Sequence, residues 1–210
     1  MDFYDVINKR RTVREFECDD IPMEVIERIV DAAMKAPSND HLRDWEYIVI
    51  KDKKIMAKVL DVDTIPREFS DEEMNELAKS WNLNDIHQFN AYKLAVPKQY
   101  RMLYEANALI IPIFKEKVDI LHPADISCLN AFASIWCSIE NFLLASTYEG
   151  YGCSLRIALS KEMDNAKNVL NIPEEYFIPC FLGLGKPKKG AKLCKQKEIN
   201  TKEKIHYNKF

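Results

Sequence analysis

The chain has 210 residues and a mass of 24.5 kDa, and 47% of its residues are hydrophobic while 30% are charged. This length supports one sizeable hydrophobic core, so one domain is expected, and the composition is too polar for a bundle of membrane helices. The formal net charge is -3 and the pI is about 5.9, which argues against a dedicated nucleic-acid-binding protein.

The predicted elements alternate between helices and strands, which indicates an α+β fold without internal repeats. Prolines bound the second helix, because Pro22 falls in its first turn and Pro37 stops it. In chain order we expect a helix at 2–9, an extended run at 10–16, a helix from 20 to 36, a polar loop at 36–41, a strand at 45–50, helices at 53–60 and from 71 onward, a strand at 108–114, a helix at 126–148, a strand at 153–159, a helix at 160–171 and a strand at 178–184.

The sequence also predicts where two of these elements lie in the fold. Pro112 lacks a backbone N–H, so the apolar strand at 108–114 is predicted to lie at a sheet edge or at a bulge. The segment 126–148 is long enough to cross a membrane, but Glu140 at the lipid centre would cost about 2 to 3 kcal/mol or more. We therefore predict a buried helix closed by Gly150, with no membrane contact.

Glycine, cysteine and histidine limit the sites that the chain can build. Residues 1–149 contain no glycine, which excludes an early Walker or dinucleotide-binding loop. The six cysteines show no C-x-x-C spacing and the four histidines form no ligand pair, so no metal site is predicted. Residues 1–14 lack the apolar core of a signal peptide, so we expect a cytoplasmic protein with reduced cysteines.

Basic residues gather at both ends of the chain. Residues 186–210 hold nine lysines and carry a net charge of +7, which leaves -10 on residues 1–185. Near the N-terminus, Arg10, Thr12 and Arg14 share one face if the chain is extended there. Guanidinium groups suit phosphate oxygens, so this run predicts a phosphate site; the alternative is a solvated run of charge.

Five ordered motifs, which span nearly the whole chain, resemble the nitroreductase family of FMN-dependent flavoproteins. They are the run Arg10-Arg11-Thr12-Val13-Arg14-Glu15-Phe16, the loop Ala36-Pro37-Ser38-Asn39-Asp40-His41-Leu42-Arg43-Asp44-Trp45, the turn Gly150-Tyr151-Gly152, the strand end Gly183-Leu184-Gly185-Lys186-Pro187 and the terminus His206-Tyr207-Asn208-Lys209-Phe210.

The resemblance implies a nitroreductase-like α+β fold, in which a central mixed, mostly antiparallel β-sheet is flanked by helices in an intertwined homodimer. It implies one FMN-binding domain over residues 1–210. Within it, 61–105 would be a variable helical region over the substrate pocket, and 186–210 would be a C-terminal arm that packs on the partner subunit.

The family pattern also implies how the cofactor would be held. Arg10, Arg11, Thr12 and Arg14 would bind the FMN phosphate and one flavin edge, while Pro37, Ser38 and Asn39 would approach the flavin from the second subunit. Lys195 and Lys197 would return to the phosphate, or else belong to a solvated tail. The cofactor-binding candidates are Arg10, Arg11, Thr12, Arg14, Pro37, Ser38, Asn39, His41, Leu155, Arg156, Lys195 and Lys197. No catalytic side chain is expected, because FMN carries the chemistry.

The chain departs from the family pattern at several positions. His41 and Arg43 stand where Asn and Gln are usual, and Asp44 replaces the proline before Trp45. His41 either supplies the cofactor with a donor whose charge depends on pH, or lies on the surface. Arg156 either offsets negative charge on reduced flavin or forms a salt bridge.

The activity implied by the resemblance is a ping-pong reaction, in which NAD(P)H reduces FMN and a small electron-poor acceptor, such as a nitroaromatic or a quinone, takes the electrons. Side chains of residues 65–101 could line the acceptor pocket or belong to a core, namely Trp81, His87, Phe89, Tyr92, Tyr100 and Arg101. Two other functions stay open: a non-enzymatic FMN-binding or redox-sensing protein, and a nucleic-acid-associated module that uses the basic ends.

Overall fold

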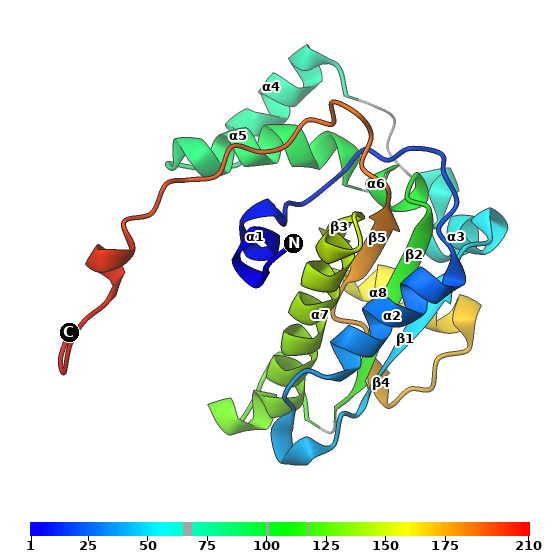
Figure 1. Cartoon of the computed structure of the whole chain (residues 1–210). Helices are drawn as coiled ribbons and strands as arrows, with labels where there is room; N and C mark the ends of the chain where they lie inside the picture. Colours follow the sequence, from blue (N-terminus) through cyan, green and yellow to red (C-terminus); the bar gives the residue numbers. More distant parts are fainter. Residues whose placement is uncertain (65–68, 100, 117) are drawn as a thin grey trace. The chain divides into compact units, whose positions relative to one another are not determined.

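A computed structural model of the chain describes residues 1–64, 69–99, 101–116 and 118–210 (Figure 1). Its contacts form two compact units, unit 1 with residues 1–67 and 98–193 and unit 2 with residues 68–97 and 194–210. A single domain over residues 1–210 stays a prediction, and each unit is described by itself.

Unit 1 is built on an antiparallel β-sheet. Its strands lie in the order β1 (Trp45–Ile50), β2 (Ala108–Lys115), β5 (Phe181–Gly185) and β3 (Gly152–Arg156), and the short β4 (Tyr176–Phe177) pairs with the end of β2. Register places Trp45 opposite Phe114 and Gly152 opposite Gly185. A parallel bridge from Thr12 to Cys153 makes the pairing mixed. The predicted mixed, mostly antiparallel sheet is confirmed, whereas the homodimer stays a prediction.

Helices cover both faces of this sheet (Figure 1). The first face packs against α2 (Met23–Met34) and α7 (Asn130–Tyr148), and α1 (Phe3–Lys9) lies against α7. The second face packs against α3 (Lys53–Leu60), α6 (Arg101–Tyr104) and α8 (Ser160–Leu170).

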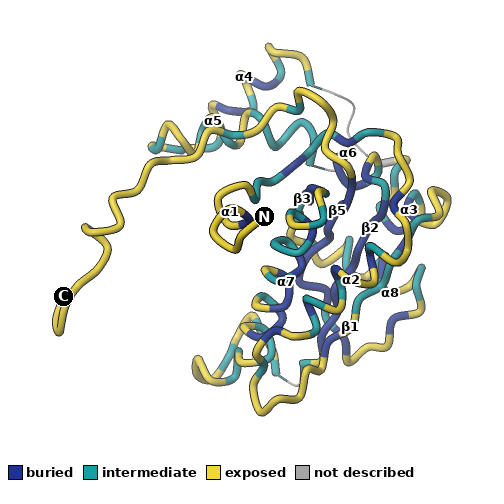
Figure 2. Tube along the Cα trace, viewed as in Figure 1, coloured by how far each residue is buried: buried dark blue, intermediate teal, exposed yellow. Residues whose placement is uncertain are grey.

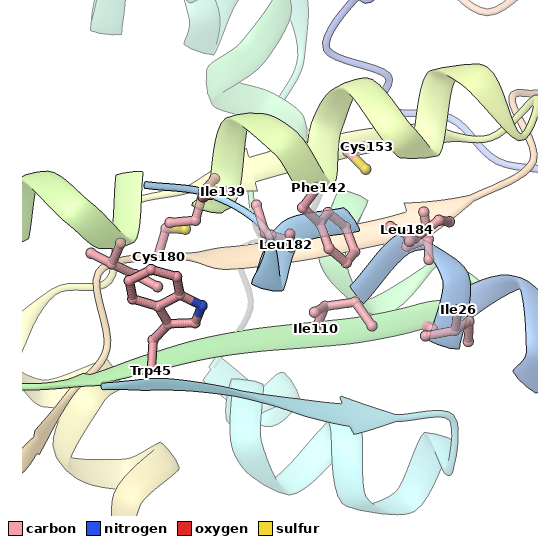
Figure 3. Close-up of a cluster of buried hydrophobic side chains, with 14 of the residues drawn as sticks. Ile26, Trp45, Ile110, Ile139, Phe142, Cys153, Cys180, Leu182 and Leu184 are labelled. Atoms are coloured by element: carbon pink, nitrogen blue, oxygen red, sulfur yellow. The ribbon is translucent and has the colours of Figure 1, made fainter. Parts of the chain in front are cut away.

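Strand β2 is apolar and buried from Ala108 to Phe114, because both of its faces are covered there (Figure 2). Ala108, Ile110 and Phe114 belong to the core under α2 and α7, while Leu109, Ile111 and Ile113 belong to the core under α3 and α8. Figure 3 shows the first core, where Ile110 and Leu182 of the sheet lie beneath Phe142 and Ile139 of α7.

The prediction that Pro112 lies at a sheet edge was wrong, because β2 lies between β1 and β5. Pro112 stands opposite Tyr47 on one side. On the other side, pairing with β5 ends at Ile110, and pairing with β4 begins at Phe114. The proline therefore stands beside an interruption in the ladder, where a missing N–H is tolerated as it is at a bulge.

Two predicted strand boundaries also need correction. The strand predicted at 153–159 ends at Arg156, because Leu159 is already the N-cap residue of α8 and its backbone N–H donates to Glu162. The strand predicted at 178–184 is replaced by β4 and β5, with Pro179 between them.

The long apolar segment forms a 3-10 turn, Ile126–Leu129, followed by α7. In the described part of the chain, Ile126–Tyr148 could cross a membrane by length and composition alone, a test that core helices of soluble proteins also pass. The prediction of a buried helix holds for one face only, since Ile135, Ile139 and Phe142 are buried while Cys137 and Glu140 are exposed.

Unit 2 contains α4 (Asp71–Lys79) and α5 (Ile86–Ala95), together with the 3-10 turn Thr201–Lys204 in the tail. A capping box begins α4, since Ser70 and Glu73 bond to each other's backbone N–H groups, and the helix predicted from 71 onward is present. The Trp81 ring packs edge-on against Phe89 and Tyr92, with centroids 6.0 and 5.5 Å away. These aromatic rings therefore contact one another within unit 2.

Among the described residues, further 3-10 turns lie at Asn39–His41, Val62–Thr64 and Val96–Lys98.

Candidate cofactor-binding site

The arginine-rich segment runs along β3, the last strand of the sheet. The Val13 N–H donates to the Cys153 carbonyl at 2.8 Å, beside the parallel bridge from Thr12 to Cys153. Three residues on, Phe16 forms an antiparallel bridge with Pro187. The extended run predicted at 10–16 is therefore confirmed as an added, irregular edge to the sheet.

The neighbouring side chains Arg10 and Arg11 of this segment have different surroundings. Val13 is buried against Gly152, and Arg11 and Val13 both line a cavity of about 390 Å³. Arg10 faces the other way, because its Nε lies 3.9 Å from Glu140 Oε1 on α7. Regular alternation would place Thr12 and Arg14 on the same side as Arg10 and would separate Arg11 from them.

Arg10 also lies near a buried thiol. Burial raises the pKa of Cys153 to about 12, against the opposing effects of a hydrogen bond with Ser146 and the charge of Arg10. The thiol is therefore protonated at neutral pH and is a poor nucleophile.

Two carboxylates fasten the start of the basic tail to the arginine segment. Glu15 accepts hydrogen bonds from Lys98 Nζ at 2.7 Å and from the Lys192 N–H at 2.8 Å, and Glu17 accepts one from the Lys189 N–H at 2.8 Å. The Lys98 bond, followed by the Lys192 bond, holds the pKa of Glu15 below its usual value. The tail therefore begins beside the arginines.

The loop that carries the second motif is strained and firmly tied. Asp40, His41 and Arg43 have φ values of 50°, 57° and 50°, which non-glycine residues rarely adopt. The Ser38 hydroxyl accepts a bond from the Arg43 N–H at 3.2 Å, and the Asn39 N–H donates to Ser134 Oγ of α7 at 3.0 Å.

A pocket of about 190 Å³ opens between this loop, the end of β2 and the start of α7. Ser38, Asn39 and Ser134 give it polar groups, and two basic residues, Arg43 and Lys115, line it together with two acidic ones, Asp44 and Glu116. Pro37 and His41 are exposed, and neither is among the described residues that line the pocket. The structure therefore gives His41 a surface position within this chain.

The two candidates at the end of β3 have different surroundings. Leu155 packs partly buried against the first core, opposite Leu182. The Arg156 guanidinium donates to Glu162, and their side chains are only 11% and 22% exposed. The salt bridge that the sequence left open for Arg156 is present, while contact with flavin stays a prediction.

Lys195 and Lys197 belong to unit 2. Lys197 Nζ lies 2.7 Å from Asp85 Oδ2, and this bond, followed by the backbone N–H groups of Gln88 and His87, lowers the pKa of Asp85 to about 2. The return of the two lysines to a phosphate stays a prediction. Of the pocket candidates, Tyr100 lies outside the described residues, and Arg101 pairs with Glu105.

A model of the nitroreductase family matches residues 7–186. The chain belongs to the nitroreductase family. A curated relative, iodotyrosine deiodinase of Haliscomenobacter hydrossis, is 28% identical over 191 residues, which cover 90% of this chain and 81% of that protein.

Solved structures share the fold of this nitroreductase-family chain. A BluB-like flavoprotein from Clostridium difficile 630 aligns over 100% of both chains with a TM-score of 0.72 and 24% identity. Oxidised iodotyrosine deiodinase bound to FMN and 3-iodo-L-tyrosine aligns over 99% of both chains with a TM-score of 0.71 and 19% identity. The predicted nitroreductase-like fold is confirmed.

The donor set on the α7 side of the arginine segment fits a phosphate group. Arg10 and Arg14 offer guanidinium donors, and Thr12 between them offers a hydroxyl. Glu140 is the one carboxylate that the described residues place within 4.0 Å of Arg10. No three His, Cys, Asp or Glu side chains among the described residues gather as metal ligands.

Sequence reasoning missed Glu15, Lys98 and Glu140 as neighbours of the site. Glu15 stands inside the arginine run, and Glu140 is the one charged residue between positions 130 and 148, so both carried a sequence signal. Lys98 is far from residue 15 in the chain, and only the fold brings its ammonium group to Glu15.

Proposed function

We propose that this nitroreductase-family chain binds FMN and acts as an oxidoreductase, which passes electrons from NAD(P)H to a small electron-poor acceptor such as a nitroaromatic or a quinone. One observation carries the proposal: the segment that holds Arg10, Thr12 and Arg14 is extended and fixed to the edge of the sheet, where side-chain alternation would place these three residues on one face. Membership of the family supports FMN as the ligand of this face.

Bound FMN would accept hydride and deliver electrons. Arg10 and Arg14 would hold its phosphate by charge-assisted hydrogen bonds, and the Thr12 hydroxyl would donate between them. Arg11 lines a separate cavity with Val13, so in this arrangement it would contribute through its backbone rather than its side chain. Lys195 and Lys197 would add positive charge if the tail returns to the phosphate.

A second copy of the chain would complete the site. The face of α7 away from the sheet exposes Ala133, Cys137 and Tyr148, which a single chain leaves uncovered. The loop with Pro37, Ser38 and Asn39 is held rigidly by Ser134, as a group that approaches a partner's flavin should be. We therefore propose a homodimer in which this loop and the C-terminal arm contact the partner subunit.

A halogenated tyrosine is a second candidate acceptor, favoured by the curated relative named iodotyrosine deiodinase. In that reaction two electrons and one proton would replace the carbon–iodine bond with a carbon–hydrogen bond, and iodide would leave. A protein that binds FMN without turnover is the alternative from another class.

Purified protein would be tested with NADH or NADPH and each acceptor in turn. Rapid NAD(P)H oxidation with a nitroaromatic or quinone supports the first acceptor class, and iodide release from 3-iodotyrosine supports the second. Bound FMN with neither reaction supports the non-enzymatic alternative. A protein that neither contains nor takes up FMN would contradict the whole proposal.

A further inference from the structure

Glu140 is the one charged side chain of α7, and it stands beside the candidate phosphate site. Of the 19 residues in Asn130–Tyr148, the rest are apolar or uncharged. Its Oε1 lies 3.9 Å from Arg10 Nε, and the two side chains are 54% and 31% exposed. A carboxylate therefore lies next to a guanidinium that would otherwise be available to an anion.

The ion pair between Arg10 and Glu140 is weak enough for a phosphate group to displace the carboxylate. A separation of 3.9 Å is at the outer limit of a salt bridge, and pairs with this much exposure contribute little to stability. A phosphate oxygen bound to Arg10 would share the guanidinium with the carboxylate, and the two negative charges would repel each other. The neighbouring Cys153 thiol is neutral and adds no charge to this balance.

We infer that Glu140 is a positioning residue that restrains the affinity of the site for FMN by competing for Arg10. The inference rests on the proposed function, because it requires the FMN phosphate to bind Arg10. In the absence of the cofactor, Glu140 keeps the guanidinium near the site; when the phosphate binds, the carboxylate opposes it.

The test is a flavin titration of cofactor-free protein with the isosteric variant Glu140→Gln. We expect the dissociation constant for FMN to fall by about two- to tenfold, because the opposing charge is lost. Riboflavin has no phosphate, so its affinity should stay unchanged. Glu149→Gln is the matched control, since Glu149 caps the same helix but pairs with Arg28, and it should leave FMN affinity as in the wild type.

A double-mutant cycle with Arg10→Ala adds a second readout. If Glu140 acts mainly by competing for Arg10, then Glu140→Gln should raise FMN affinity by a smaller factor in the Arg10→Ala background than in the wild type. An unchanged or weakened FMN affinity in Glu140→Gln would overturn the inference, and so would an equal gain for riboflavin. If either result is found while Arg10→Ala alone weakens FMN binding, only the inference about Glu140 fails and the proposed function stands. If Arg10→Ala binds FMN as the wild type does, the proposed phosphate site is itself wrong.

Discussion

Replacing Gly152 with alanine should damage both stability and cofactor binding, because this glycine is where the arginine segment meets β3. A Cβ at Gly152 would lie 2.5 Å from Val13 Cγ2, 2.8 Å from Val13 Cβ and 3.2 Å from Pro187 Cγ, whereas ordinary contact begins at 3.4 Å. Rotation of the valine can move Cγ2 but not Cβ, which is fixed to the backbone. The segment itself must therefore shift by several tenths of an ångström.

Such overpacking costs about 1 to 3 kcal/mol, which corresponds to a fall in Tm of about 2 to 12 °C for a chain of this size. The shift also moves Thr12 and Arg14, which flank Val13, so FMN affinity should fall with stability. Thermal unfolding and FMN titration of the same preparation measure the two effects.

Gly183→Ala is the matched control for this variant. A Cβ there would lie 2.5 Å from Ser154 Oγ and 3.0 Å from the Met102 carbonyl, on the face of the sheet that α6 covers. It should lose comparable stability while keeping its FMN affinity. If Gly152→Ala binds FMN as tightly as Gly183→Ala does, the arginine segment does not position the phosphate contacts.

Three further outcomes are expected. Arg10→Ala with Arg14→Ala should yield mostly cofactor-free protein, since two charge-assisted contacts of about 1.5 to 3 kcal/mol each would be lost, and full flavin occupancy would exclude both residues. Glu15 has a folded-state pKa below its ordinary value of 4.5, so the stability that it contributes is present at neutral pH and is lost as pH falls through that range. Glu15→Gln should therefore lower Tm at pH 7 and weaken the pH dependence of Tm between about 5 and 3. Parallel profiles of Tm against pH for the two proteins would contradict this. Deletion of residues 198–210 should weaken both the dimer and FMN binding, because burial of even one aromatic side chain contributes about 1.5 to 3 kcal/mol. Sedimentation measures the oligomeric state and absorbance measures the bound flavin. A truncated protein that stays dimeric and keeps its flavin would show that the arm is dispensable.

Much of the fold follows from local patterns in the sequence. The helix predicted from its apolar spacing between 20 and 36 forms at Met23–Met34, and the strand predicted from aromatic and β-branched residues forms at Trp45–Ile50. The edge position predicted from Pro112 was wrong because a missing N–H removes only one local hydrogen bond. The place of β2 in the sheet depends instead on pairing with β5, which comes much later in the sequence. The end of β3 was missed because Glu162 caps the next helix by reaching back to Leu159.

The candidate site was only partly predictable for a similar reason. Alternation in an extended run places Arg10, Thr12 and Arg14 together, and the same rule separates Arg11, which the family pattern had grouped with them. Contacts such as Glu140 with Arg10 join residues 130 positions apart, so only the packing of α1 and the arginine segment against α7 brings them together.

The most direct test of the central claim is the visible absorption spectrum of the purified protein, followed by identification of the flavin released on denaturation. We expect an oxidised flavin spectrum and FMN in roughly stoichiometric amount with the chain. A colourless protein that takes up no FMN when the cofactor is added in excess would contradict it.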